Sequence, residues 1–352
     1  MERHCSEMAT SDHRLMIDQF GNSSEMVYIE KFYLDDVIAS ASHRPHPAFV
    51  VDGIELDGIY ISKYQNVVIN GLACSIAGVD PTTNINFDDA QKVCSLKGPG
   101  WHLMTALEWG AIALWCQKNN FFPYGNNDMG KDIREDDYIA KISYIDMKKN
   151  ICRVATGSGP TSWSHNGCSD GIYDLNGNIW EWNNGIRLVF GELQMIPNSN
   201  ELQCIPEFKS DAWRAIDGIT GKLILPNGHG TTPNSIKLEF ADNAWKFVTK
   251  EKIALVNRCQ MCKFSDITAH NSICSYAIEW LYALGCLPIS SDNHNLNVSF
   301  YANNGAKEKI LFRGGRFGLG MDSGLYKSCF DDERSYFGPA VGFRSAYICK
   351  NE

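Results

Sequence analysis

The sequence predicts an α+β fold with many loops. Of its 352 residues, 44% are hydrophobic and 11% are aromatic, so the chain can bury a sizeable core. Thirty glycines divide the sequence into short segments, which excludes a helical bundle. Most apolar segments are short and rich in β-branched or aromatic residues, and only a few show helical spacing. We find no internal repeat and no linker, so we expect one elaborated domain.

Charge and hydropathy exclude two classes of partner. The formal net charge is −9, and no cluster of Lys and Arg is visible, so a nucleic-acid backbone is not expected as a partner. No segment approaches the apolar length of a membrane helix, and Met1 to Phe20 lacks the apolar run of a secretion signal. We therefore expect a product that is made soluble in the cytoplasm, without a signal peptide and without membrane insertion.

The 13 cysteines are scattered and odd in number, which favours reduced, mostly buried thiols over a disulfide scaffold. Cys259 and Cys262 form the only C-x-x-C pair. A zinc site would need a second pair, so we interpret these two residues as core or loop thiols.

Short apolar runs predict strands along much of the chain. Residues 1–24 are polar and unpatterned, and we expect a loose N-terminal arm there, followed by a single domain at 25–352. The predicted strands are 26–29, 49–51, 59–64, 101–104, 187–190 and 235–240. Gly53 and Gly58 bracket a hairpin turn. Residues 126–170 are polar and irregular, which indicates an insertion.

Capping signals predict two helices. The first covers about 87–97, with Asn86 as N-cap and Gly98 just beyond its end. The second covers 105–117, because Thr105 and Glu108 have the spacing of a capping box. A further helical stretch lies near 275–284.

One motif dominates the middle of the sequence. The run from Gly171 to Trp182 reads GIYDLNGNIWEW, in which turn formers and oxygen donors precede two tryptophans that flank a carboxylate. It resembles the G-x-Y-D-x-x-G-N-x-W-E-W signature of the formylglycine-generating-enzyme (sulfatase-modifying factor) branch of the C-type lectin fold. The resemblance implies a C-type lectin fold, formylglycine-generating-enzyme-like and elaborated with long loops and insertions, in which Trp109, Trp180 and Trp182 are largely buried.

A second stretch extends this resemblance. Gly100 to Trp109 resembles the R-L-P-T-x-x-E-W motif of the same family, with His102 and Met104 in place of its arginine and proline. We interpret His102 as a satisfied packing residue, because nothing nearby supplies a nucleophile that it could activate.

The C-terminal end differs from the family's enzymes where their chemistry takes place. Phe312 to Gly315 and Val341 to Ala346 resemble the family's R-G-G-S and G-F-R motifs. The enzymes carry a pair of reactive cysteines shortly after R-G-G, whereas this chain has none before a single Cys329. We therefore expect no enzymatic activity. The alternative, an oxidase acting on a cysteine of a substrate protein, would require Cys329 to lie next to another cysteine.

Another branch of the fold is similar over roughly residues 25 to 352. The motifs at 61–66, 84–88, 100–115 and 157–160, the central run and the R-G-G and G-F-R-S-A ends together resemble the variable proteins of diversity-generating retroelements, often carried by bacteriophages. Such proteins have a C-terminal segment rewritten by an adenine-mutating reverse transcriptase. The resemblance implies a hypervariable binding surface for a surface protein or glycan of a host or target cell. It also implies association with a virion or display after release, and leaves a homo-oligomer open; a structural virion protein without a ligand is a further alternative.

By this resemblance, residues 313–346 form the variable region. Randomised AAC or AAT codons cannot give Lys, Met, Glu, Gln or Trp, so Met321, Lys327 and Glu333 would be fixed. The residues that fit the rule are Gly318, Leu319, Asp322, Tyr326, Cys329, Asp331, Asp332, Tyr336, Gly338, Pro339 and Ala340. With Arg316 and Phe317 they form the expected ligand-binding surface.

The segment 316–340 lacks strand and helix periodicity, which indicates a surface loop. We expect the side chains of Leu319, Asp322, Tyr326, Asp332 and Tyr336 to be exposed on one face. An ordinary closing loop of the core is the alternative.

The resemblance also suggests how the ends of this region are held. Gly314 and Gly315 allow tight backbone geometry, while Phe343 and Arg344 would be tied to the core and to a buried carboxylate or carbonyl, with Glu181 as one partner. No cofactor is required. The family's enzymes bind calcium near the central turn, so a structural calcium site is a further hypothesis. Its oxygen ligands would be Asp174, Asn176, Asn178 and Glu181.

Overall fold

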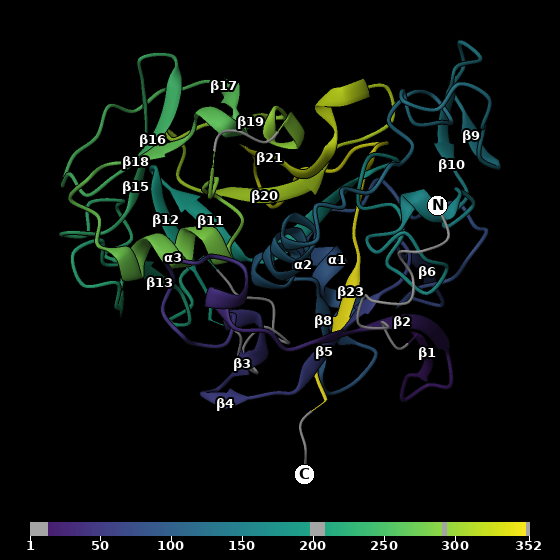
Figure 1. Cartoon of the computed structure of the whole chain (residues 1–352), viewed down its shortest axis with the longest axis horizontal. Coiled ribbons are helices and arrows are strands. Elements are labelled where there is room, and N and C mark those ends of the chain that lie inside the picture. Colours follow the sequence, from purple (N-terminus) through teal and green to yellow (C-terminus); the bar gives the residue numbers. More distant parts are fainter. Residues whose placement is uncertain (1–12, 198–207, 291–293, 350–352) are drawn as a thin grey trace.

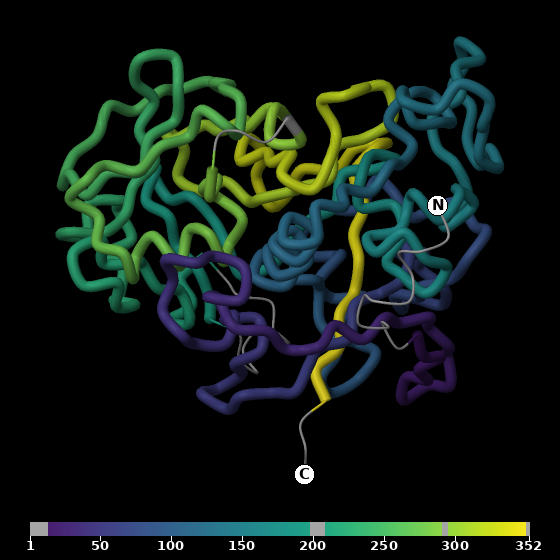
Figure 2. Tube along the Cα trace, in the orientation of Figure 1, coloured from purple at the N-terminus to yellow at the C-terminus, as the bar shows by residue number. Residues whose placement is uncertain are grey.

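The computed structural model describes residues 13–197, 208–290 and 294–349, and its strands form two main sheets (Figure 1). The five-stranded sheet has the order β1 (His13–Ile17), β2 (Ser23–Glu30), β5 (Gly58–Ser62), β23 (Ser345–Tyr347) and β8 (Trp101–Leu103). It brings the C-terminal strand between two strands from the first third of the chain, as Figure 2 shows for the yellow segment.

The larger sheet has twelve strands. Nine follow one path: β17 (Gln260–Lys263), β19 (Ser299–Ala302), β21 (Gly324–Asp332), β20 (Lys309–Gly314), β11 (Trp180–Val189), β12 (Glu192–Met195), β15 (Lys237–Ala241), β16 (Ala244–Val248) and β18 (Thr268–Ala269). Three lie beside this path: β13 (Arg214–Ile216), β14 (Leu223–Ile224) and β22 (Val341–Gly342). Three separate hairpins pair β3 (Val50–Val51) with β4 (Ile54–Glu55), β6 (Val67–Ile69) with β7 (Leu72–Cys74), and β9 (Ile142–Ile145) with β10 (Ile151–Val154).

The three predicted helices are present as α1 (Phe87–Ser95), α2 (Ala106–Lys118) and α3 (Ser275–Ala283). The Asn86 side chain accepts a hydrogen bond from the Asp89 amide, which confirms the predicted N-cap of α1. The capping box of α2 is also confirmed, because Thr105 Oγ1 accepts from the Glu108 amide and a Glu108 carboxylate oxygen accepts from the Thr105 amide.

Helix α2 lies at the centre of the molecule, between the two sheets (Figure 1). Its buried side chains belong to one apolar cluster that extends from Val27 to Ile348 and includes strands of both sheets. Gly110 lets α3 approach closely, since a Cβ at this position would lie 1.9 Å from the carbonyl oxygen of Ala283. The core therefore joins segments from both halves of the chain.

The central motif leads into β11, the middle strand of the larger sheet. The strand begins at Trp180, well before the predicted strand at 187–190, and all its residues are buried. Burial on both faces removes the alternation that sequence analysis uses, and the Asn-Asn-Gly run at 183–185 resembles a turn. The three tryptophans expected in the core are buried, with exposed fractions of 0% for Trp109 and Trp182 and 9% for Trp180.

The expectation of a loose arm at 1–24 is wrong for its second half, while residues 1–12 lie outside the described part. Residues 13–17 form β1, which pairs antiparallel with β2. A polar turn fixes this register, because Asp18 Oδ1 accepts hydrogen bonds from the amides of Phe20 and Asn22. His13 also pairs with Glu25 across the two strands at 3.0 Å.

The expectation of an irregular surface loop at 316–340 is also wrong in part. Gly324–Asp332 form β21, which lies between β19 and β20 in the larger sheet. Lys327, Cys329 and Asp331 face one side of this strand, whereas Tyr326 and Phe330 face the core on the other. Irregularities in the pairing of β20 with β21 interrupt the alternation, which explains why the sequence shows no strand period.

In the described part of the chain, no helix has both the length and the apolar character needed to cross a membrane. Ten cysteines there have free thiols, as expected, whereas Cys168 is disulfide-bonded.

Candidate functional site

The C-terminal end of the 313–346 region is held by a buried ion pair. Arg344 Nε and Nη2 each donate to a carboxylate oxygen of Glu181 at 2.9 Å, and both side chains are almost fully buried. The same guanidinium donates to the carbonyl oxygens of Ser62 and Tyr173 at 2.8 Å. The predicted partner of Arg344 is thus confirmed. Because Glu181 lies in β11 and Ser62 in β5, this contact joins the two sheets.

At the other end, Gly314 and Gly315 have φ values of 90° and 81°. A Cβ on Gly315 would lie 2.4 Å from Ser323 Oγ, so only glycine fits this turn.

A pocket of about 570 Å³ lies between these two ends. Its lining comes from β11, β19, β20, β21 and β22, from the loop after β20, from the segment before β22 and from the residue that precedes β17. The residues are Trp180, Cys259, Tyr301, Phe312, Arg316, Phe317, Leu319, Lys327, Cys329, Asp331, Asp332, Tyr336, Pro339, Ala340 and Val341. This pocket is the candidate functional site.

Nine of the thirteen residues expected from the sequence line this pocket. They are Arg316, Phe317, Leu319, Cys329, Asp331, Asp332, Tyr336, Pro339 and Ala340. Gly318 lies beside them and is exposed, while Gly338 is buried. The sequence therefore anticipated much of one wall of the pocket.

Two of the expected binding residues take structural roles instead. Tyr326, expected to be exposed, is only 2% exposed; its ring stacks on Phe264 and its hydroxyl donates to Gln117 Oε1 at 2.7 Å. Asp322, half-buried, forms an ion pair with Lys327 and accepts a hydrogen bond from the Ser299 amide at 2.6 Å. Both corrections follow from β21, which the sequence did not reveal. Leu319 and Asp332 are half-buried, and Tyr336 is 40% exposed as expected.

The pocket combines aromatic walls with charges of both signs. Phe312 packs edge-on against Trp180 at 5.0 Å between ring centroids and stacks with Tyr336 at 6.4 Å. The ammonium of Lys327 lies 4.4 Å from the ring centroid of Tyr301. Burial lowers the pKa of Lys327, and its pair with Asp322 opposes this effect. Apolar walls with a few polar groups are typical of ligand pockets.

Two cysteines that are distant in sequence share this pocket, namely Cys259 and Cys329. Burial and the nearby carboxylate of Asp331 raise the pKa of Cys259 to about 12. Burial also raises the pKa of Cys329 well above its usual value, with the negative charge of Asp332 acting in the same direction. Both groups are therefore protonated thiols at neutral pH, whereas a nucleophilic or metal-bound cysteine must be a thiolate.

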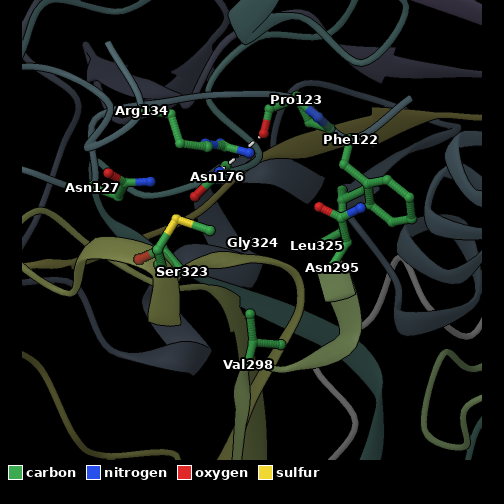
Figure 3. A pocket seen from close by; sticks show the side chains of 11 residues that line it. Phe122, Pro123, Asn127, Arg134, Asn176, Asn295, Val298, Ser323, Gly324 and Leu325 are labelled. Carbon is green, nitrogen blue, oxygen red and sulfur yellow. Dashed lines mark hydrogen bonds between the residues drawn. The ribbon is translucent and has the colours of Figure 1, made fainter. Parts of the chain in front are cut away.

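Two of the four residues of the calcium hypothesis use their side-chain oxygens in hydrogen bonds within the protein. Both carboxylate oxygens of Glu181 accept from Arg344, and Asn178 Oδ1 accepts from Asn126 Nδ2 and the Val154 amide. Asp174 Oδ1 and Asn176 Oδ1 are buried and have no hydrogen-bond partner among the described residues. Asn176 instead lies at a small cavity of about 30 Å³, where it donates to the carbonyl oxygen of Pro123 beside Arg134 (Figure 3). A structural calcium site stays a hypothesis.

Asp174 leads to a prediction about pH. Burial raises the pKa of this carboxyl group from 3.8 to about 6, so the folded state holds its proton more tightly than the unfolded state does. The contribution of this group to stability should therefore fall as the pH rises from about 4 to about 6, and stay level above. We expect Asp174→Asn to raise the free energy of unfolding at pH 8 by up to about 2–3 kcal/mol, with the difference vanishing near pH 4.

The measurement is urea unfolding of both proteins at several pH values, in the presence of a chelator. Asparagine tolerates the positive φ of 63° at this position and can still accept from the Gly157 amide. A variant less stable than the parent protein at pH 8 would contradict the prediction. Repeating the series with calcium tests the metal hypothesis, which requires calcium to stabilise the parent protein and not the variant.

His102 is a satisfied packing residue, as expected. Its ring nitrogens contact the Gly100 carbonyl oxygen and Glu108 Oε1, each at 2.9 Å, and the side chain is buried. Burial opposes protonation, but the charge and hydrogen bond of Glu108 raise the pKa of the imidazole. The ring thus connects β8 to the first turn of α2.

Two sheets around a central helix, with an Arg344–Glu181 contact closing the C-terminal region, define a C-type lectin fold of the formylglycine-generating-enzyme type. Residues 14–187 match the family described as the sulfatase-modifying factor enzyme 1-like domain, and this is slightly less than half of the chain. The comparison with curated protein sequences gives no match.

Solved structures with similarity to the chain include PvdO from Pseudomonas aeruginosa, at 13% identity and a TM-score of 0.40, with 97% of this chain and 100% of PvdO covered. Treponema denticola variable protein 1 has 10% identity and a TM-score of 0.32, with 96% and 99% covered. The Major Tropism Determinant U1 variant has 10% identity and a TM-score of 0.30, with 96% and 72% covered.

Sequence analysis missed several pocket residues because they come from other parts of the chain. Cys259 and Tyr301 reach the pocket only because β17 and β19 extend the sheet beyond β21. Trp180 was assigned to the scaffold and Phe312 only to the R-G-G motif, and both side chains also form walls of the pocket. Exposed aromatic residues next to a turn would mark such a site, but Trp180, Tyr301 and Phe312 lie at buried or half-buried strand positions.

Proposed function

We propose that the protein binds a ligand through the pocket described above, and that this surface is diversified as in the variable proteins of retroelements. It would attach to a surface molecule of a host or target cell, from a virion or after release, and it would catalyse no reaction. The observation that carries this proposal is that nine residues expected to vary line a single pocket with aromatic walls.

The frame around the pocket supports this role. The ends of the region are held by the Arg344–Glu181 pair and by the Gly314–Gly315 turn, while the middle is anchored on β21. A rigid frame lowers the entropy cost of binding, so that a few anchor residues can supply most of the affinity.

The gene itself offers the most direct test. Sequencing its 3′ end across a population should show substitutions concentrated at the codons of pocket residues such as Leu319, Asp331 and Tyr336. Lys327 should stay fixed because it is buried and ion-paired, and Tyr326 should be far less variable than its codon allows. Variation spread evenly along the gene, or no variation at all, would contradict retroelement diversification.

Two tyrosines provide a matched pair of variants. Tyr336→Ala should change the free energy of unfolding by about 0.5 kcal/mol, because its side chain is 40% exposed, yet it should weaken ligand binding. Tyr326→Ala should destabilise the fold by about 3 kcal/mol, because it empties a buried site. Thermal unfolding of both variants gives the comparison. Equal losses of stability would mean that the pocket wall is part of the core and not a binding surface.

An oxidase is the second candidate, favoured by one observation: Cys329 shares the pocket with Cys259. The raised pKa of both thiols opposes it, because thiolates would be scarce at neutral pH. Alkylation with iodoacetamide at pH 7.5 separates the two candidates. We expect both thiols to react far more slowly than the exposed Cys349, whereas rapid alkylation of either pocket cysteine would favour the enzyme.

A further inference from the structure

We propose that the pocket receives a basic side chain, the guanidinium of an arginine or the ammonium of a lysine, from a protein ligand. This inference rests on the proposed function and specifies the chemistry of its ligand. It draws on three features of the pocket: its aromatic faces, its unequal charges and its apolar rim.

The aromatic walls are suited to a cation. Rings of Trp180, Tyr301, Phe312, Phe317 and Tyr336 line the pocket, and the face of an aromatic ring attracts positive charge. The pocket already uses this attraction internally, since Lys327 Nζ lies 4.4 Å from the Tyr301 centroid and Arg316 Cζ lies 5.3 Å from that of Phe317. Tyr336 is 40% exposed and Trp180 is 9% exposed, so the ring of Tyr336 is the more accessible of the two.

The charges of the lining leave an excess of carboxylate. Lys327 is neutralised by its ion pair with Asp322, which is not part of the lining. Arg316 is then the remaining positive charge of the lining, and Asp331 and Asp332 supply two negative charges. The Asp332 carboxylate has no hydrogen-bond or ion-pair partner among the residues that the structure describes. An incoming cation would therefore find one uncompensated negative charge.

The environment of Asp332 supports this charge count. Burial raises the pKa of its carboxyl group, the negative charges of Asp331 and Glu333 act in the same direction, and Lys309 opposes them only in part. Lys309 is itself shared, because its ammonium lies 4.0 Å from Glu333. A basic group in the pocket would supply the missing counter-charge in a partly desolvated setting, where ion pairs are stronger than in water.

The rim indicates that the cation belongs to a protein and not to a small molecule. Two exposed apolar side chains lie beside the lining: Met129, which is 42% exposed and lies against Gly318, and Phe337, which is 62% exposed and follows Tyr336 in the sequence. Met129 belongs to the insertion at 126–170. This insertion contacts the loop after β20, because the Gly320 amide donates to the Asn127 carbonyl oxygen at 2.8 Å. Both segments lie in the upper right of Figure 2. A free cation would leave this rim uncovered, whereas a protein segment would bury it.

The test uses defined probes on the whole chain. Isothermal titration compares a Leu-Arg-Leu tripeptide, blocked at both ends, with the same peptide carrying neutral citrulline in place of arginine, and with spermidine. We expect the arginine peptide to bind at least 10-fold more tightly than the citrulline peptide. We expect it to exceed spermidine as well, because only the peptide covers the rim.

Variants identify the groups involved. The double variant Asp331→Asn and Asp332→Asn should weaken binding of the arginine peptide at least 10-fold, while Asp57→Asn, an exposed carboxylate in the five-stranded sheet region, should not alter it. Equal binding of arginine and citrulline peptides would overturn the cation proposal and leave the binding function standing. Tighter binding of spermidine would overturn the assignment to a protein. If no probe binds and the population shows no variation at the pocket codons, both proposals fail.

Discussion

Replacing Glu181 by glutamine is expected to lower the free energy of unfolding by about 3–5 kcal/mol. The carboxylate accepts two hydrogen bonds from the Arg344 guanidinium and a third from Gln65 Nε2. Glutamine is nearly the same size, so no cavity forms, but the arginine charge would then be buried without a counter-ion. Because this pair joins β11 to the C-terminal segment, the variant should also loosen the pocket. Urea unfolding measures the loss.

An exposed ion pair is the control for this experiment. Asp242 and Lys246 form such a pair at the solvent-exposed end of the hairpin of β15 and β16, where the Asp242 side chain is 84% exposed. Asp242→Asn should change stability by less than about 1 kcal/mol, because exposed pairs contribute little. If the two substitutions cost the same, the Glu181–Arg344 contact would be an ordinary salt bridge and would not explain how the C-terminal segment is held.

Trp182→Ala should cost about 3–5 kcal/mol and leave a protein that is barely folded. The indole is fully buried, lies edge-on to Phe87 at 5.9 Å and to Phe312 at 5.1 Å, and donates to the Ile85 carbonyl oxygen at 3.1 Å. Alanine removes contacts with α1 and with β20 at once. Thermal unfolding monitored by circular dichroism provides the measurement.

Trp182→Phe is the graded control. It keeps an aromatic ring in the site and removes mainly the hydrogen bond to Ile85, so a loss of about 1 kcal/mol is expected. Trp180→Ala should cost less than Trp182→Ala, because one edge of Trp180 already faces the pocket. Equal effects of the two alanine variants would show that the pocket is closed in solution.

Patterns within a short stretch of sequence predicted the elements that such a stretch determines. The start of α2 follows from a capping box of two residues. The contact of Arg344 with Glu181 was also anticipated, but through the resemblance of the two motifs to a known family and not through any local pattern. Nothing in the spacing of these residues requires them to meet.

The features that the sequence did not predict depend on the order of the strands in the larger sheet. In β21, Lys327 lies between Tyr326 and Ser328, and all three side chains are buried. Because both faces of the strand are buried, the sequence does not show the alternation of polar and apolar residues that marks a strand with one exposed face. The proximity of Cys259 to Cys329 arises from the insertion of β19 beside β21. Such long-range pairings leave no signal within a short window of one sequence.

The two-sided character of β21 limits how such a surface can evolve. Along a strand, a position free to accept new residues alternates with one that carries the core, so random change over the whole segment would mostly yield chains that do not fold. If a diversifying mechanism changed all positions of β21 alike, many of the resulting variants would not fold. In the proposed retroelement mechanism, a fixed position such as Lys327 would preserve a buried ion pair in every variant, so that the sheet as well as the gene would set the range of binding surfaces.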